Sequence, residues 1–201
     1  NYVKGKTFIT GRIEDELYQK FSETKVIDLL KREELTVLNT ISTAEGAIQI
    51  AMEESTKTLH GSKILVMGFG RVSKILSNML KGIGAEVYCE TRTTVNCAWI
   101  KAYGYKPILL DELDNELNQF DIIINTIPHI ILNKEKLKLL KRDCLIIDIA
   151  SNPGGVDRKA AKEIGIKLIW ALSLPGRVAP ITSAEFIKET LENILKDIKN
   201  N

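Results

Sequence analysis

A short apolar run, a turn with two glycines and a strongly periodic helical stretch follow one another between residues 63 and 83. The run Lys63–Met67 predicts a strand that turns sharply at the glycines and continues into a helix. The free N–H groups at the start of such a helix can bind the diphosphate of a dinucleotide. The segment therefore predicts a dinucleotide-binding turn. Its predicted contact residues are Gly68, Phe69, Gly70, Arg71 and Val72.

Apolar runs alternate with helical patterns throughout the chain from residue 62 onward. This alternation predicts an α/β fold, a Rossmann-like doubly wound parallel sheet with helices on both faces and a small N-terminal appendage. Ligands of such sheets bind beyond the carboxyl ends of the strands, so the segments after the strands are expected to carry the function. The predicted strands are Lys63–Met67, Ala85–Glu90, Lys106–Leu110, Asp121–Asn125, Cys144–Ile149 and Ile166–Trp170.

The first sixty residues differ in pattern from the rest. We expect residues 1–60 to form a partial N-terminal, substrate-binding domain with a linking helix, and residues 61–201 to form the dinucleotide-binding domain with a C-terminal helix. Apolar spacing predicts two short helices, around 17–21 and 26–30, and Leu35–Leu38 predicts a strand.

Two later segments have the spacing of a helix capping box. Ser42 and Glu45 predict the start of the linking helix, and Thr182 with Glu185 predicts the start of the last helix.

Composition narrows the function classes. The 28 Lys and Arg residues nearly balance the 26 Asp and Glu residues without forming a basic stripe, so nucleic acid is not an expected partner. No apolar run approaches the ~20 residues that cross a bilayer. Cys89, Cys97 and Cys144 have neither disulfide-framework nor metal-cluster spacing, which fits a reducing cytoplasm. The chain starts at Asn1 without Met or a signal-peptide core, which indicates a cut or processed start.

Several motifs outside the glycine turn are distinctive in combination. They are Thr43–Ala47, Asn125–Pro128, Ser151–Gly155 and Leu174–Pro180. From about Asn39 to the C-terminus, the chain resembles the family of A-type subunits of dipicolinate synthase, which are NADP-dependent oxidoreductases of spore-forming bacteria. Members of that family carry a larger N-terminal domain, so the resemblance implies an N-terminally shortened chain.

The resemblance implies oxidation of hydroxy-tetrahydrodipicolinate to dipicolinate, with loss of water and of a hydride. It also implies a second, flavoprotein subunit of the synthase (the B-type subunit) and leaves homo-oligomerisation open. A dianionic substrate needs cationic or N–H-rich partners. The candidates are Arg177 and the helix starts predicted near Thr43 and Thr182; for Arg177, an ordinary solvated loop cation is an equal alternative.

The end of the second strand bears on the choice of cofactor. Glu90 lies near the ~20-residue offset at which a carboxylate binds the ribose 2′-hydroxyl of NAD. Arg92 and Thr93 instead suit the 2′-phosphate of NADP, as the resemblance implies. We expect NADP, with NAD as the alternative.

The loops after the next two strands are expected to lie beneath the nicotinamide and its ribose. The residues predicted there are Thr126, Ile127, Pro128, Ala150 and Ser151. His129 is a candidate proton relay, and Ser151 is a second candidate catalytic residue; for His129, a surface position is the alternative.

Two other functions fit the same sequence. One is a D-2-hydroxyacid dehydrogenase-like enzyme, although the usual Arg, Glu and His set of that class has no convincing counterpart here. The other is a nucleotide-binding, non-catalytic assembly subunit, which the serine at the third glycine position, Ser73, would also permit.

Overall fold

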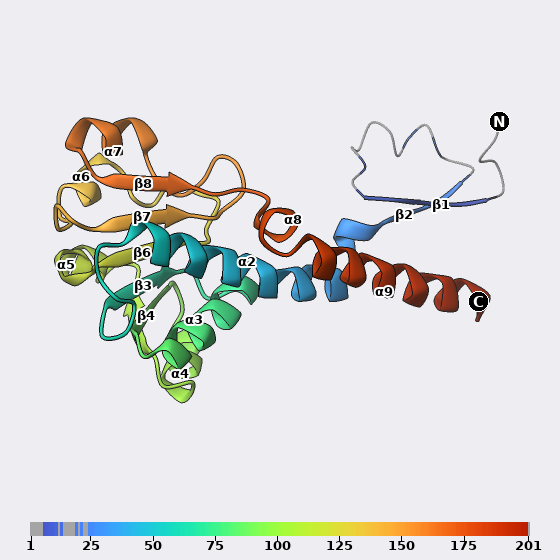
Figure 1. Ribbon diagram of the computed structural model, residues 1–201, viewed down its shortest axis with the longest axis horizontal. Helices are drawn as coiled ribbons and strands as arrows, with labels where there is room; N and C mark the ends of the chain where they lie inside the picture. The colour runs from blue at the N-terminus through green and yellow to red at the C-terminus, as the bar shows by residue number, and fades with distance from the viewer. Residues whose placement is uncertain (1–5, 12, 14–18, 20, 22–23, 201) are drawn as a thin grey trace.

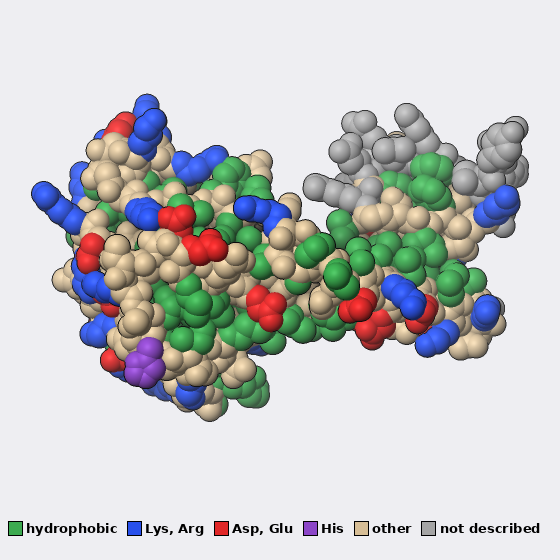
Figure 2. All heavy atoms as spheres, in the orientation of Figure 1, with side chains coloured by type: hydrophobic (Ala, Val, Ile, Leu, Met, Phe, Trp, Pro, Cys, Tyr) green, Lys and Arg blue, Asp and Glu red, His purple; other side chains and the backbone are tan. Residues whose placement is uncertain are grey.

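The computed structural model describes residues 6–11, 13, 19, 21 and 24–200, and these form two lobes (Figure 1). The larger lobe holds a six-stranded sheet, and the smaller lobe holds a two-stranded sheet beside the C-terminal helix. In Figure 2 the two lobes are separated by a narrower waist, which Figure 1 shows to be formed by helical segments. Within the described residues, no helix is both long enough and apolar enough to cross a membrane.

All neighbouring strands of the large sheet are parallel, in the order β5-β4-β3-β6-β7-β8. Consecutive strands run outward from β3 in one direction and from β6 in the other, which is the doubly wound arrangement. The predicted Rossmann-like fold is therefore confirmed, and each predicted strand is present within one residue of its expected bounds. The strands are β3 (Lys63–Met67), β4 (Glu86–Thr91), β5 (Lys106–Leu109), β6 (Ile122–Asn125), β7 (Leu145–Asp148) and β8 (Lys167–Trp170).

Helices cover both faces of this sheet. Alternate residues of a strand point to opposite faces, so Ile64 and Val66 join one buried cluster while Leu65 and Met67 join another. The first cluster includes residues of α2 and α3, and the second includes residues of α5, α6 and α7. The helices of this lobe are α2 (Glu33–Glu54), α3 (Arg71–Ile83), α4 (Thr94–Ala102), α5 (Leu113–Glu116), η2 (Leu117–Gln119), α6 (Lys134–Leu137), α7 (Arg158–Ile164) and α8 (Leu174–Val178).

Helix α2 begins nine residues before the predicted capping box at Ser42. The strand predicted over Leu35–Leu38 is wrong, because these residues form part of the first two turns of α2. The predicted cap is wrong too: Ser42 is buried in mid-helix, and its hydroxyl donates to the Asn39 carbonyl at 3.4 Å. Burial at helical spacing along α2, from Leu35 to Ala51, outweighs the local strand preference of Leu-Thr-Val-Leu.

The N-terminal segment also differs from its prediction. Strands β1 (Thr7–Thr10) and β2 (Lys25–Asp28) pair in parallel, and a single 3-10 turn, η1 (Leu29–Lys31), follows. The helix predicted over 26–30 is therefore wrong, and the β-branched pair in β2 explains why a strand forms. The helix predicted over 17–21 falls mostly outside the described residues.

Helix α9 (Pro180–Lys199) belongs to the smaller lobe rather than to the sheet. It begins at Pro180, a residue favoured at the first helical position, and not at the predicted cap near Thr182. Ile194, which is 1% exposed, forms a small buried cluster with Leu29 and Leu35. The two ends of the described chain therefore share one core.

An ion cluster lies at the amino-terminal edge of the large sheet. Asp121 accepts hydrogen bonds from Lys57 Nζ at 2.9 Å, the Lys63 N–H at 3.0 Å and Lys141 Nζ at 3.1 Å. Partial burial raises the pKa of Asp121, but these donors outweigh it and lower the pKa from 3.8 to about 2.

Candidate functional site

The glycine turn lies where β3 feeds α3, at the carboxyl edge of the sheet. Gly68 has a φ of +89°, which L side chains rarely adopt. A Cβ at this position would lie 2.9 Å from both Thr126 Oγ1 and Ile127 Cγ1. Residue 68 therefore has to be glycine for the turn to pass this close to the loop after β6.

The start of α3 presents main-chain N–H groups. Its N-cap is Gly70, and no side chain caps it among the described residues. The first N–H groups of a helix have no partner within the helix, and α3 runs for 13 residues, so this end carries a partial positive charge. Ser73 is fully buried, and its hydroxyl lies 3.0 Å from Thr126 Oγ1, which ties the helix to the loop after β6. The turn is therefore a ready anion site.

A cavity of about 490 Å³, here called the β4 cavity, opens on one side of this turn. It brings together eight residues that the sequence predicted to bind cofactor, from the turn, the end of β4 and the loop after β6. Its lining residues are Gly68, Phe69, Gly70, Glu90, Thr91, Arg92, Thr93, Asn96, Thr126, Ile127 and Pro128.

Glu90 is turned inward within the β4 cavity. It is 1% exposed, and its Oε2 accepts the Gly68 N–H at 3.0 Å. Its Oε1 is buried without a partner in the described part of the chain. Burial raises the pKa of Glu90, although the Gly68 N–H and the nearby Arg92 act in the opposite direction. Oε2 of Glu90 thus supports the glycine turn, and Oε1 can accept a hydrogen bond from a ligand.

The outer rim of the β4 cavity is polar and partly cationic. Arg92 is exposed there. Thr93 caps α4 by accepting the Asn96 N–H at 3.2 Å, and the Asn96 amide donates to Thr91 Oγ1 at 3.1 Å. The Thr93 hydroxyl, the Asn96 amide and the Arg92 guanidinium therefore border one corner of the β4 cavity. Asn96 and Thr91 were not predicted; a helix cap directly after a strand is the sequence signal that could have found them.

The loops beneath the cavity rest on a buried polar network. Asn125 Nδ2 donates to Asp148 Oδ1 at 2.8 Å and to the Ile127 carbonyl at 3.0 Å, while Asn125 Oδ1 accepts the Ile127 N–H at 3.2 Å. Asp148 also accepts the N–H groups of Ala150 at 3.1 Å and Gly155 at 2.8 Å. These side chains hold the β6 and β7 loops together.

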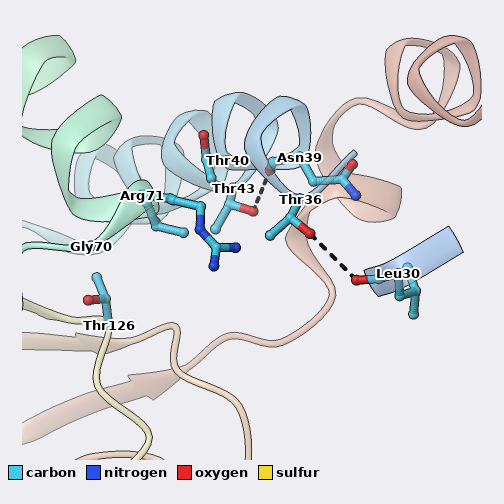
Figure 3. A pocket seen from close by; sticks show the side chains of 9 residues that line it. Leu30, Thr36, Asn39, Thr40, Thr43, Gly70, Arg71 and Thr126 are labelled. Carbon is cyan, nitrogen blue, oxygen red and sulfur yellow. Dashed lines mark hydrogen bonds between the residues drawn. The ribbon is translucent and has the colours of Figure 1, made fainter. Parts of the chain in front are cut away.

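A second cavity, also of about 490 Å³, opens on the other side of the turn and is here called the α2 cavity (Figure 3). It shares Gly70 and Thr126 with the β4 cavity, so the two adjoin. Its lining residues are Leu30, Thr36, Asn39, Thr40, Thr43, Gly70, Arg71, Val72 and Thr126.

Thr43 lies in this cavity for a different reason from the one predicted. It sits in the middle of α2, and its hydroxyl donates to the Asn39 carbonyl at 2.7 Å, so it offers no helix N-terminus. Thr36, Asn39 and Thr40 were missed. Their spacing with Thr43 is that of one helical face, a signal hidden by the incorrect strand prediction.

The remaining candidates line neither cavity. His129 and Ser151 are exposed just after β6 and β7, and Ala150, which follows β7, is buried. Arg177 is exposed on α8, and Thr182 is exposed in the first turn of α9. All five are described, and the structure does not gather them with the glycine turn in one cavity.

Comparison with known proteins gives the family. The family model for the D-isomer specific 2-hydroxyacid dehydrogenase, NAD binding domain, matches residues 32–162, a range that includes the glycine turn and both loops beneath it. The chain belongs to this family. The cofactor class is therefore a nicotinamide dinucleotide.

The most informative relatives are A-type subunits of dipicolinate synthase. This chain is 36% identical to the A-type subunit of Bacillus subtilis over 178 residues, which make up 89% of this chain. It spans 60% of the length of that protein. The crystal structure of the B. subtilis protein superposes with a TM-score of 0.93 at 34% identity, over 98% of this chain and 67% of that one. The crystal structure of the A-type subunit from Bacillus halodurans superposes with a TM-score of 0.90 at 31% identity, over 96% of this chain and 67% of that one. The resemblance read from the motifs is confirmed.

Proposed function

We propose that this chain is the dinucleotide-binding part of an NADP-dependent oxidoreductase that converts hydroxy-tetrahydrodipicolinate to dipicolinate. The observation that carries the proposal is the pair of adjoining cavities on either side of an uncapped helix start. The dipicolinate synthase relatives support the choice of substrate. A second synthase subunit is the partner that their name implies.

The residues present fit a dinucleotide. The Cβ missing at Gly68 leaves the turn close to the β6 loop, and the open N–H groups of Arg71 and Val72 can hold a diphosphate. The β4 cavity would take the adenosine half, beside Phe69. Bound nicotinamide supplies the hydride acceptor, and the protein aligns the substrate C–H bond with it.

The preference for NADP depends on Arg92. Its exposed guanidinium, the Thr93 hydroxyl and the Asn96 amide form the corner where a 2′-phosphate would be bound. Glu90 is buried and its Oε2 accepts the Gly68 N–H, so its carboxylate is not exposed at the corner that Arg92 occupies.

One observation favours NAD as a second candidate. Glu90 Oε1 lacks a donor among the described residues, and a ribose hydroxyl would supply one. The two cofactors therefore make opposite demands on Glu90.

The β6 and β7 loops are proposed to hold the nicotinamide end. Thr126, Ile127 and Pro128 already border the β4 cavity. Loss of water from the substrate needs a proton donor at the same edge of the sheet, and His129 and Ser151 follow the two strands that end there.

Calorimetric titration with NAD and with NADP tests the binding claim, and formation of reduced nicotinamide from hydroxy-tetrahydrodipicolinate tests the reaction. The reaction should be assayed with and without the second synthase component. Tighter binding of NADP and turnover of this substrate support the proposal. Cofactor binding without turnover in either assay favours a non-catalytic assembly role, and turnover of simple 2-hydroxy acids favours a dehydrogenase.

A further inference from the structure

Among the described residues that line the α2 cavity, Arg71 is the one that carries a charge, and the others are apolar or uncharged polar groups. Figure 3 shows the Arg71 guanidinium between the hydroxyl-bearing face of α2 and Thr126. Arg71 lines the α2 cavity and is not among the residues that line the β4 cavity.

The threonines of this wall are fixed as acceptors. Thr36 donates its hydroxyl hydrogen to the Arg32 carbonyl at 3.0 Å, and Thr40 donates to the Val37 carbonyl at 2.6 Å. Thr43 likewise donates its hydroxyl hydrogen to the Asn39 carbonyl, one turn earlier in the helix. Their oxygens therefore keep only lone pairs for a ligand, which suits a ligand with hydroxyl or N–H donors.

We infer that the α2 cavity binds a hydroxylated carboxylate substrate, with Arg71 holding a carboxylate and the α2 threonines accepting from hydroxyl groups. The inference rests on the proposed function and deepens it, because it assigns the substrate's anionic group to Arg71 instead of Arg177. A planar guanidinium can bind a carboxylate through two parallel hydrogen bonds.

Glu33 is the present partner of Arg71. Its Oε1 lies 3.2 Å from Arg71 Nε, and the two side chains are 69% and 53% exposed. Such exposed pairs are weak, so an incoming carboxylate would displace Glu33 at a cost of at most about fivefold in affinity. Glu33 therefore competes with the substrate's carboxylate for the Arg71 guanidinium.

Dipicolinate, the product of the proposed reaction, is a suitable probe in calorimetry on the full chain, in buffer free of divalent cations. Arg71→Gln should weaken dipicolinate binding by about tenfold or more through loss of a charge-assisted pair. Arg71→Lys should have an intermediate effect, because it keeps the charge without the planar fork. Glu33→Gln should tighten binding by up to about fivefold.

The controls separate this inference from the cofactor proposal. Glu34→Gln removes a neighbouring carboxylate that pairs with Arg32, and Arg142→Gln removes an exposed arginine outside both cavities; neither should change dipicolinate affinity by more than about twofold. Absence of dipicolinate binding in the wild type, or unchanged affinity in Arg71→Gln, would overturn the inference while NADP binding persists. Absence of NADP and NAD binding in the wild type would instead refute the proposed function.

Discussion

Gly155 offers a sharp test of how the β6 and β7 loops are supported. A Cβ at this position would lie 2.2 Å from Asn125 Nδ2 and 2.7 Å from the Ile127 carbonyl oxygen. The amide of Asn125 has no free direction to move, because it is bound to Asp148 and to Ile127. Gly155→Ala must therefore displace a buried, fully bonded side chain.

Two costs add up in this variant. Overpacking a close-packed site costs about 1–3 kcal/mol. Breaking a hydrogen bond of buried Asn125 leaves a polar group unsatisfied, at a further cost of about 1–3 kcal/mol. The free energy of unfolding should therefore fall by about 2–6 kcal/mol. NADP affinity should fall as well, since Ile127 and Pro128 border the β4 cavity.

Urea denaturation followed by circular dichroism measures the first effect, and calorimetry measures the second. Gly82→Ala is the matched control: Gly82 lies inside α3, and apart from its chain neighbours and the backbone of its own helix, no atom of the described residues lies within 4 Å of the added Cβ. This variant should gain about 0.5–1 kcal/mol from helix propensity. Equal unfolding midpoints for Gly155→Ala and the wild type would show that the Asn125 network accommodates the added methyl group without cost.

Three further predictions concern other parts of the molecule. Asp121 has a folded-state pKa below its unfolded value, so it contributes about 2 kcal/mol to the free energy of unfolding above pH 4, and this contribution is lost as the pH falls toward 2. Asp121→Asn should therefore flatten this part of the stability–pH profile, measured by urea midpoints. Arg92→Gln should weaken NADP binding about tenfold or more and leave NAD binding nearly unchanged in calorimetry; equal losses for both cofactors would count against a phosphate site. Ile194→Ala should lower the free energy of unfolding by about 2–5 kcal/mol, in urea titrations, without changing NADP affinity, because Ile194 is buried in the smaller lobe.

Much of the larger lobe could be read from the sequence because its strands are buried on both faces. Near-continuous apolar runs such as Ile122–Ile124 have few alternatives to a central parallel strand. The glycine turn was recognisable for a related reason: its position between a strand and a periodic helix limits what it can be.

The smaller lobe and the α2 cavity were harder to predict, because long-range packing decides them. Leu35–Leu38 has a strand-like composition, and only its contact with the distant α9 shows why helix is preferred. The inward turn of Glu90 was likewise invisible, since it depends on an N–H donor 22 residues away, just beyond another strand.

In the proposed complex, main-chain N–H groups at the start of α3 hold the diphosphate of a nicotinamide dinucleotide. A ¹H–¹⁵N correlation spectrum recorded during titration with NADP tests it most directly. The amide resonances of Gly70, Arg71 and Val72 should shift among the most, together with those of the residues that line the β4 cavity. Saturable binding that leaves these three amide resonances unmoved would contradict it.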